Sequence, residues 1–357
     1  MAFHRELREM VDWTWTNRNE IMTAALNNAV QQKGHTHRMM SPAEPNAPGR
    51  TINLGIDMIY RHYCAAGNRG QEQPTAIVIE NFLRELNRRL NTKLKPEPYV
   101  ILQTGGAWVE LGEFNKLMNR TDINGSYIHF NKKEGICLER VYINLKEETR
   151  GTSFGGIMLK MWGISGVLSI KVAAPGSVGA DSAVVYCSSS SARKKVISKL
   201  KKYQRSKPRH FNGEIPKLVA SAGVPGVGHG AEPPSKQPMR PNSQTFSAVD
   251  ASQSFGLYRA SLIFIALERT VFPKDVQFDP REEYNPKRIN RNQKREFEQR
   301  VQTLFERGGL SVQHPHKQKK VKFDTEVDVV MPPPEGPPPP PPPGPPPTVQ
   351  RELHVSL

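Results

Sequence analysis

The chain has 357 residues, of which 37% are apolar and 8% aromatic, enough for the core of one large domain or two modest ones. It carries 50 Lys and Arg against 34 Asp and Glu, a formal net charge of +16. No apolar stretch approaches the ~18–20 residues that span a bilayer, and three scattered cysteines exclude a disulfide framework. We therefore expect a cytoplasmic protein with no signal peptide, no membrane segment and no structural zinc site.

The first part of the chain is predicted to be helical. Apolar residues recur at helical spacing over residues 2–32, which predicts one long helix. Two more helices are expected over residues 51–65 and 77–91, separated by a polar turn.

The pattern changes near residue 95, where short β-rich runs bounded by glycine, asparagine or proline predict strands. A short helix is expected over 157–162, and residues 206–250, rich in Pro, Gly and Ser, predict a long irregular segment. Two helices follow, over 252–272 and 291–307, the second ending at a Gly-Gly C-cap. The predicted strands cover residues 99–102, 126–130, 137–145, 167–172 and 183–187.

These elements predict an α+β fold with N-terminal helices, a central, mostly antiparallel sheet and flanking helices. We divide the chain into a helical region over 1–94, an α+β domain over 95–310, and a basic, then polyproline, disordered tail over 311–357. Residues 332–347 hold 13 of the 31 prolines, and such a run adopts polyproline II. The run is either a ligand for a polyproline-binding domain or a stiff tail.

The positive charge is confined to two stretches. Residues 193–209 hold nine Lys or Arg and no acid, and residues 281–322 hold twelve against five Glu, which together account for the whole net charge. The first stretch is predicted to be a helix with an apolar stripe of Val196, Ile197, Leu200 and Tyr203. Its lysines either form a solvated face or bind a phosphorylated or acidic partner. Nucleic-acid binding is disfavoured, because no zinc finger, basic zipper or RNA-recognition signature is present.

Standard catalytic and cofactor signatures are absent. There is no Walker A loop, HExxH, GxSxG or Rossmann fingerprint, and the glycines of residues 223–230 lack the GK[ST] ending of a phosphate loop. Histidine pairs at 35/37 and 314/316 lie in polar segments and are expected at the surface rather than on a metal. The sequence therefore predicts no metal and no cofactor.

Four short motifs carry the strongest signal when they are taken in order. They are ERVYINL (139–145), SIKV with ADSAVVYC (169–172 and 180–187), VPGVGHGAEP (224–233) and QSFGLYRA (253–260). This set resembles the HopA-type type III effector family, over about residues 125–270. The same domain occurs as a stand-alone lyase in class V lanthipeptide and thioamitide biosynthesis. The chain departs from the family pattern at Gly179, where Arg is frequent, and at Tyr258, where His is frequent.

The resemblance implies a phosphoserine/phosphothreonine lyase. A Ser/Thr peptide kinase would first phosphorylate a precursor peptide, and the lyase would then eliminate phosphate to leave dehydroalanine or dehydrobutyrine. Such chemistry needs a base for the Cα proton, cations for the departing phosphate and an acid for the bridging oxygen.

Candidate residues for the base and the phosphate contacts follow from the matched motifs. Lys171 lies in an apolar strand, where burial favours a neutral amine able to act as the base. The alternative is a lysine that faces outward from the strand. Arg140 and Arg259 are candidate phosphate clamps, since guanidinium matches phosphate with two parallel hydrogen bonds. Asp181 would orient Lys171 or Arg259, and the structural alternative for Arg259 is an ion pair with Asp181. Ser254, near a helix N-terminus, offers an anion contact or an ordinary cap.

The acid and the substrate groove are less sharply defined. His229, in the predicted glycine-rich loop, and Tyr258 are the candidate acids, with His210 and then His129 behind them. Tyr142 and Asn144 alternate with Val141 and Ile143, so they face away from the core and line either a substrate groove or a solvent face.

Two other functions compete with the lyase. The chain is alternatively a non-catalytic, effector-like or adaptor protein, secreted into a host cell, that binds a kinase or another partner through its basic helix and polyproline tail. A nucleic-acid binder ranks third, because it rests on net charge alone.

Overall fold

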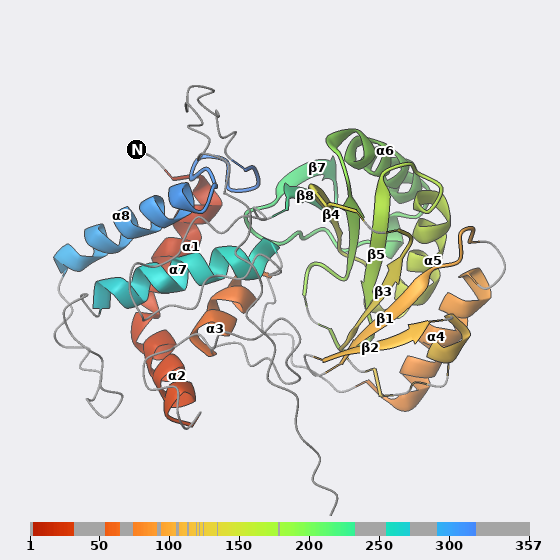
Figure 1. Cartoon of the computed structure of the whole chain (residues 1–357), viewed down its shortest axis with the longest axis horizontal. Coiled ribbons are helices and arrows are strands. Elements are labelled where there is room, and N and C mark those ends of the chain that lie inside the picture. The colour runs from red at the N-terminus through yellow and green to blue at the C-terminus, as the bar shows by residue number, and fades with distance from the viewer. Residues whose placement is uncertain are drawn as a thin grey trace, which may run out of the picture. The chain divides into compact units, whose positions relative to one another are not determined.

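Three of the four matched motifs contribute strands to an eight-stranded antiparallel sheet (Figure 1). The strand order is β2-β1-β3-β5-β6-β4-β8-β7. The strands are β1 (Tyr99–Thr104), β2 (Ala107–Gly112), β3 (Tyr127–Asn131), β4 (Glu139–Ile143), β5 (Val167–Ala173), β6 (Ala183–Cys187), β7 (Ala220–Val224) and β8 (Val227–Ala231).

The computed structural model describes thirteen stretches of the chain, all within one unit, Met1–Lys320. Of the tail predicted over 311–357, residues 311–318 are described and contact the rest of the unit, with Val312 buried. Residues 319–357 and Ser254 lie outside the described residues. The described stretches are 3–31, 54–64, 74–90, 94–104, 107–112, 114–118, 120, 122–123, 125–133, 135–177, 179–232, 255–271 and 291–318.

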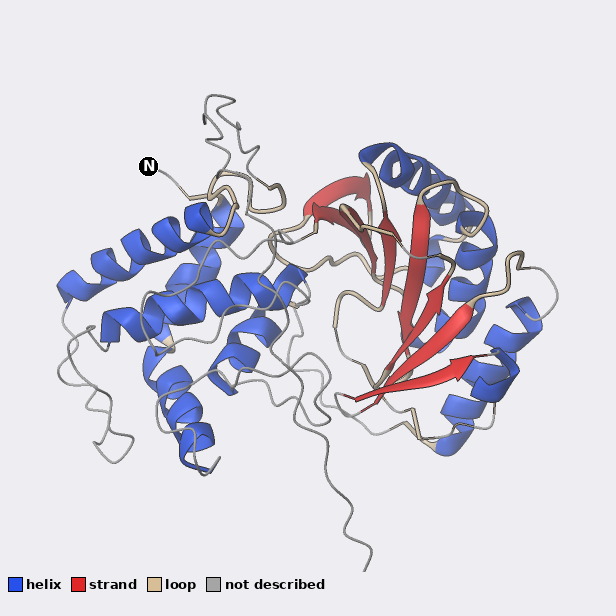
Figure 2. Ribbon diagram, viewed as in Figure 1, coloured by secondary structure: helices blue, strands red, loops and turns tan. Residues whose placement is uncertain are grey.

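The helices form two packing groups (Figure 2). In one, α4 (Ala76–Leu90), α5 (Arg150–Met161) and α6 (Ser190–Ser206) pack in series, and α5 and α6 contact the sheet. In the other, α7 packs on α3 and α8, and α1 contacts α2, α3, α7 and α8. The α+β fold is thus confirmed. The second group comprises α1 (Arg5–Thr16), α2 (Arg18–Gln31), α3 (Leu54–Tyr63), α7 (Phe255–Val271) and α8 (Arg291–Arg307).

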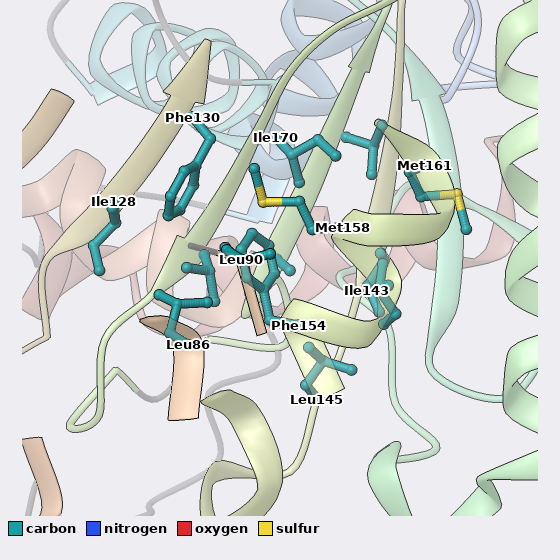
Figure 3. Close-up of a cluster of buried hydrophobic side chains, with 14 of the residues drawn as sticks. Leu86, Leu90, Ile128, Phe130, Ile143, Leu145, Phe154, Met158, Met161 and Ile170 are labelled. Atoms are coloured by element: carbon teal, nitrogen blue, oxygen red, sulfur yellow. The ribbon is translucent and has the colours of Figure 1, made fainter. Parts of the chain in front are cut away.

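One face of the sheet supplies a hydrophobic core (Figure 3). Ile128 and Phe130 of β3 and Ile170 of β5 point to this face, because alternate residues of a strand lie on opposite sides. Phe154 of α5 packs against Phe130, with ring centroids 5.7 Å apart. Val141 and Ile143 belong to the same core, as their predicted alternation with Tyr142 and Asn144 requires.

The opposite face of the sheet packs against α3 and α7 of the second helix group. Tyr142 of β4 and Val184 of β6 belong to a second cluster that includes Tyr63 of α3 and Phe255 of α7. The solvent-face alternative for Tyr142 is therefore wrong, since this residue is buried under the helices. Its side of the sheet also carries the polar residues of the candidate site.

Several predicted elements differ from those in the structure. The helix predicted over 2–32 is two helices, α1 and α2, separated at Asn17, whose side-chain amide donates to the Trp13 carbonyl at 2.8 Å. The helix predicted over 157–162 begins earlier, at Arg150, and β2 was not predicted. The segment predicted as irregular, 206–250, contains the β7–β8 hairpin, which turns at Gly226 with φ +70°, a conformation that favours glycine. Glycine's weak strand propensity concealed this hairpin.

Candidate functional site

Strand register places Lys171 and Arg140 on the same face of the sheet. Lys171 pairs with His129 on β3 and Val184 on β6, and Val184 pairs with Tyr142 on β4. Paired residues of antiparallel strands project to the same side, so Lys171, His129 and Tyr142 share a row. Arg140 lies two residues before Tyr142 and therefore on the same face.

Lys171 lies in an aromatic and acidic environment. The residue is only 8% exposed, so the outward-facing alternative is wrong. Its ammonium lies 3.8 Å from the centroid of the Tyr127 ring, within cation–π range. The Tyr127 hydroxyl donates to Asp181 Oδ1 at 3.3 Å. Burial raises the pKa of Asp181, while Lys171 and the Tyr127 hydrogen bond act in the opposite direction. Asp181 is therefore linked to Lys171 through Tyr127 and through charge.

Arg140 is buried and holds a carboxylate. Its Nε and Nη2 donate to the two oxygens of Glu232, which follows β8. The guanidinium carbon also lies 4.9 Å from the centroid of the Tyr186 ring, on β6. This is the two-pronged geometry with which arginine binds carboxylates and phosphates. Arg140 can thus hold an anion on this face of the sheet.

Lys171 and Arg140 act on the same neighbours. Burial lowers the pKa of His129 well below its usual value, and Lys171 and then Arg140 lower it further. The same two cations favour the ionised form of Asp181 against the effect of burial. The structure therefore brings Lys171, Arg140, His129 and Asp181 into one electrostatic cluster.

Two tyrosine hydroxyls near this cluster lack a hydrogen-bond partner among the described residues. They belong to Tyr142 and to Tyr63 of α3, both almost fully buried. Burial raises the pKa of both well above 10; Arg140 and Arg259 act in the opposite direction on Tyr142, and Arg259 does so on Tyr63. A buried hydroxyl without a partner costs about 1–3 kcal/mol. These two groups are therefore suited to donate to a bound ligand.

Arg259 lies close by, but its guanidinium bonds backbone carbonyls. Nε and Nη2 donate to the Pro315 carbonyl at 2.8 and 2.6 Å, and Nη1 donates to the Phe255 carbonyl at 3.0 Å. The guanidinium carbon lies 3.3 Å from the centroid of the Phe255 ring, and burial lowers the pKa of Arg259 to about 10. The expected ion pair with Asp181 is not what holds this side chain. Its phosphate-binding role stays a prediction.

Two motif glycines allow the helices to approach this face. A methyl group on Gly230 of β8 would overlap the Phe255 ring, and one on Gly256 of α7 would overlap the Tyr63 ring. The glycines of the GVGHG and SFG motifs therefore serve close packing here. They bring Phe255 to 5.7 Å from Tyr142, measured between ring centroids.

Two of the three histidine candidates, His229 and His210, lie on the other side of the sheet from Lys171. His229 is on β8 and pairs with Val141, which faces the core, and its Nδ1 lies 2.7 Å from Arg193 Nη1 on α6. His210 Nδ1 lies 3.1 Å from the hydroxyl of Tyr203, also on α6. The structure does not bring either imidazole to the Lys171 cluster.

The remaining candidates have structural contacts. The Tyr258 hydroxyl donates to the Gly308 carbonyl at 3.1 Å. The Asn144 amide donates to the Glu214 carbonyl at 3.0 Å, and its oxygen accepts from Asn212 at 3.0 Å. Asn144 is buried, so its solvent-face alternative is wrong as well.

Four side chains that surround the cluster were not among the sequence-based candidates. Tyr127 alternates with core residues on β3 in the same way as His129, so strand periodicity alone could have found it. Tyr186 occupies the corresponding position on β6. Glu232 lies in the VPGVGHGAEP motif but was given no chemical role. Nothing in the sequence signals Tyr63, which reaches the sheet from α3.

The chain is similar to two solved structures at low sequence identity. No family model matches the chain, and no curated protein matches it. An effector protein from Pseudomonas syringae pv. tomato strain DC3000 is similar in structure, with 15% sequence identity, a TM-score of 0.49 and coverage of 87% of this chain and 99% of that one. An effector protein from Pseudomonas syringae pv. syringae strain 61 gives 14%, 0.45, 84% and 98%.

Two further features bear on function. Among the described residues, no helix is long and apolar enough to cross a membrane. Within the described stretches, no group of three or more His, Cys, Asp or Glu side chains could hold a metal ion.

Proposed function

We propose that the face bearing Lys171 and Arg140 is the active site of a phosphoserine/phosphothreonine lyase. It would eliminate phosphate from a precursor peptide that a partner kinase has phosphorylated. One observation carries the proposal: a buried lysine and a buried, anion-binding arginine share one face and act on the same neighbours. The motif resemblance points to the same chemistry.

Lys171 is assigned the role of the base. Its neutral amine would take the Cα proton of the phosphorylated residue, and the electrons of that C–H bond would form the Cα=Cβ bond. The Cβ–O bond breaks, and phosphate leaves with its electron pair, so that no external oxidant or reductant is needed. The Tyr127 ring and Asp181 hold Lys171 in place.

Arg140 is assigned the role of binding the departing phosphate. The guanidinium would neutralise the charge that grows on the leaving group, which is where electrostatic stabilisation lowers the barrier. The Tyr142 and Tyr63 hydroxyls would donate to further phosphate oxygens, or to the bridging oxygen as the acid.

Elimination and binding assays with the purified full-length protein test this proposal. The purified protein should convert a phosphothreonine peptide to its dehydrobutyrine form, with release of inorganic phosphate. Lys171→Met should abolish elimination and leave phosphopeptide binding intact, whereas Lys133→Met, at an exposed lysine after β3, should change neither. Loss of binding and elimination together in Lys171→Met would argue against a base.

A second candidate, an adaptor without catalysis, is favoured by the exposed surface of α6 and the residues that follow it. Val196, Leu200 and Tyr203 of the predicted apolar stripe are buried and Ile197 is half-buried, and Ser189 caps the helix through the Ala192 amide at 3.2 Å. None of the eight exposed cations forms an ion pair within the described part of the chain. They are Lys194, Lys195, Lys199, Lys201, Lys202, Arg205, Lys207 and Arg209.

The α6 cations offer a test that separates the two functions. If they bind the partner kinase or another acidic protein, Lys199→Glu with Lys202→Glu should weaken that binding and reduce its dependence on salt concentration. A lyase would still process a short phosphopeptide in this variant. Partner binding by a protein that never eliminates phosphate would favour the adaptor.

A further inference from the structure

We propose that the Glu232 carboxylate occupies the phosphate position on Arg140, and that a phosphate dianion must displace it to bind. Glu232 would then set the specificity of the site, admitting a doubly charged phosphate and rejecting singly charged anions. The inference rests on the proposed role of Arg140 as the phosphate-binding residue.

Glu232 contacts Arg140 in the geometry expected of a bound anion. Both Glu232 oxygens accept from one edge of the Arg140 guanidinium, as a carboxylate or phosphate ligand would. The Tyr186 ring covers a face of the guanidinium, which leaves this edge as the place where an anion binds. A ligand that uses Arg140 in the same way must therefore take the place of Glu232.

The free protein needs such a counter-ion. The Arg140 side chain is only 8% exposed, and a buried charge without a partner is strongly destabilising. Glu232 satisfies that charge in the absence of substrate. The pair is therefore expected to persist until another anion replaces the carboxylate.

The Glu232 side chain can leave without disturbing the sheet. Its backbone N–H donates to the Leu138 carbonyl at 2.9 Å, and its carbonyl accepts from the Gln318 amide, so the backbone is fixed on both sides. The side chain is 17% exposed and thus lies on a route to solvent. Rotation of this one side chain, which also breaks the hydrogen bond from Cys137 Sγ to Glu232 Oε2 at 3.4 Å, would free Arg140.

A phosphate can use a donor that Glu232 leaves unused. The Tyr142 hydroxyl interacts electrostatically with both Arg140 and Glu232, yet it has no hydrogen-bond partner among the described residues. A carboxylate has only two oxygens, and both face Arg140. A phosphate has further oxygens that can accept from Tyr142. The additional charge and the additional hydrogen bond together favour the exchange.

Anion titrations of three proteins test the inference: wild type, Glu232→Gln and Glu139→Gln. Glu139 is a matched control, because it lies next to Arg140 on β4 and pairs with Arg193 at 3.6 Å. Inorganic phosphate, O-phosphothreonine and acetate are titrated by calorimetry. We expect Glu232→Gln to bind phosphate about tenfold more tightly or better, equivalent to the loss of a competitor of 1.4 kcal/mol. It should also gain acetate binding that wild type and Glu139→Gln lack.

Unchanged or weaker phosphate binding by folded Glu232→Gln would overturn the inference and make the carboxylate a fixed part of the structure. Should this variant fail to fold, the Arg140 Nε resonance of the wild type decides instead. A shift that saturates with phosphate supports displacement, and no shift refutes it. Tighter phosphate binding without elimination in any protein would leave the inference intact and refute the lyase. Elimination without the affinity gain would do the reverse.

Discussion

Replacing Arg259 by methionine separates a structural from a phosphate-binding role for this residue. Methionine keeps much of the aliphatic length but removes the guanidinium that bonds Pro315 and Phe255. The side chain is fully buried, so water cannot replace the lost donors. The variant should therefore loosen the segment around Pro315 and the first turn of α7.

The magnitude follows from the three hydrogen bonds. Each charge-assisted bond contributes about 1.5–3 kcal/mol, and the variant regains the cost of burying the guanidinium charge. We expect a net loss of about 3 kcal/mol in the free energy of unfolding, the size typical of a broken buried network. At roughly 2 °C per kcal/mol for a domain of this size, Tm should fall by about 5 °C or more.

Thermal denaturation and phosphate titration of the same variants provide the assay. Arg300→Met is the matched control, because Arg300 is a partly exposed residue of α8 that pairs with Glu296. It should lose no more than about 0.5 kcal/mol. Arg259→Met should also expose the Ala231 amide, which bonds the His316 carbonyl at 2.9 Å, to hydrogen exchange. An unchanged Tm together with lost phosphate binding would refute this reasoning and support the phosphate clamp.

Gly256→Ala should lower the free energy of unfolding by about 1–3 kcal/mol in denaturant titrations, because the added methyl overlaps the Tyr63 ring; an unaffected variant would contradict the packing. Tyr127→Phe removes the donor to Asp181 and should lower the elimination rate and shift its pH profile, with phosphate affinity unchanged. Burial and Lys317 lower the pKa of His316 from 6.5 to about 4, so the unfolded chain binds a proton that the folded protein does not. Stability should be full above pH 6.5 and fall toward pH 4, less steeply in His316→Gln.

Strand periodicity was sufficient to predict that Lys171 and Tyr142 leave the core face of the sheet. Lys171 follows Ile170, and Tyr142 lies between Val141 and Ile143, all three in the core. The sequence could not supply the strand order that places β5 and β4 on either side of β6. That order is what brings Lys171 and Arg140 to a common set of neighbours.

His229 was misplaced because its hairpin was not predicted. On an irregular loop a histidine could reach either face, whereas on β8 the register fixes it beside Val141. Gly230, one residue later, takes the side that faces Arg140. The contact of Arg259 with Pro315 could not be predicted for another reason, since the two residues lie 56 positions apart and no local pattern indicates such a contact.

Mass spectrometry of a phosphothreonine peptide incubated with the purified full-length protein tests the central claim most directly. The account predicts that the peptide loses the mass of phosphoric acid, that inorganic phosphate appears in equal amount, and that Lys171→Met stops both. An unchanged phosphopeptide, with a protein that is folded and binds phosphate, would contradict the lyase. Release of phosphate that leaves an intact threonine would instead indicate hydrolysis.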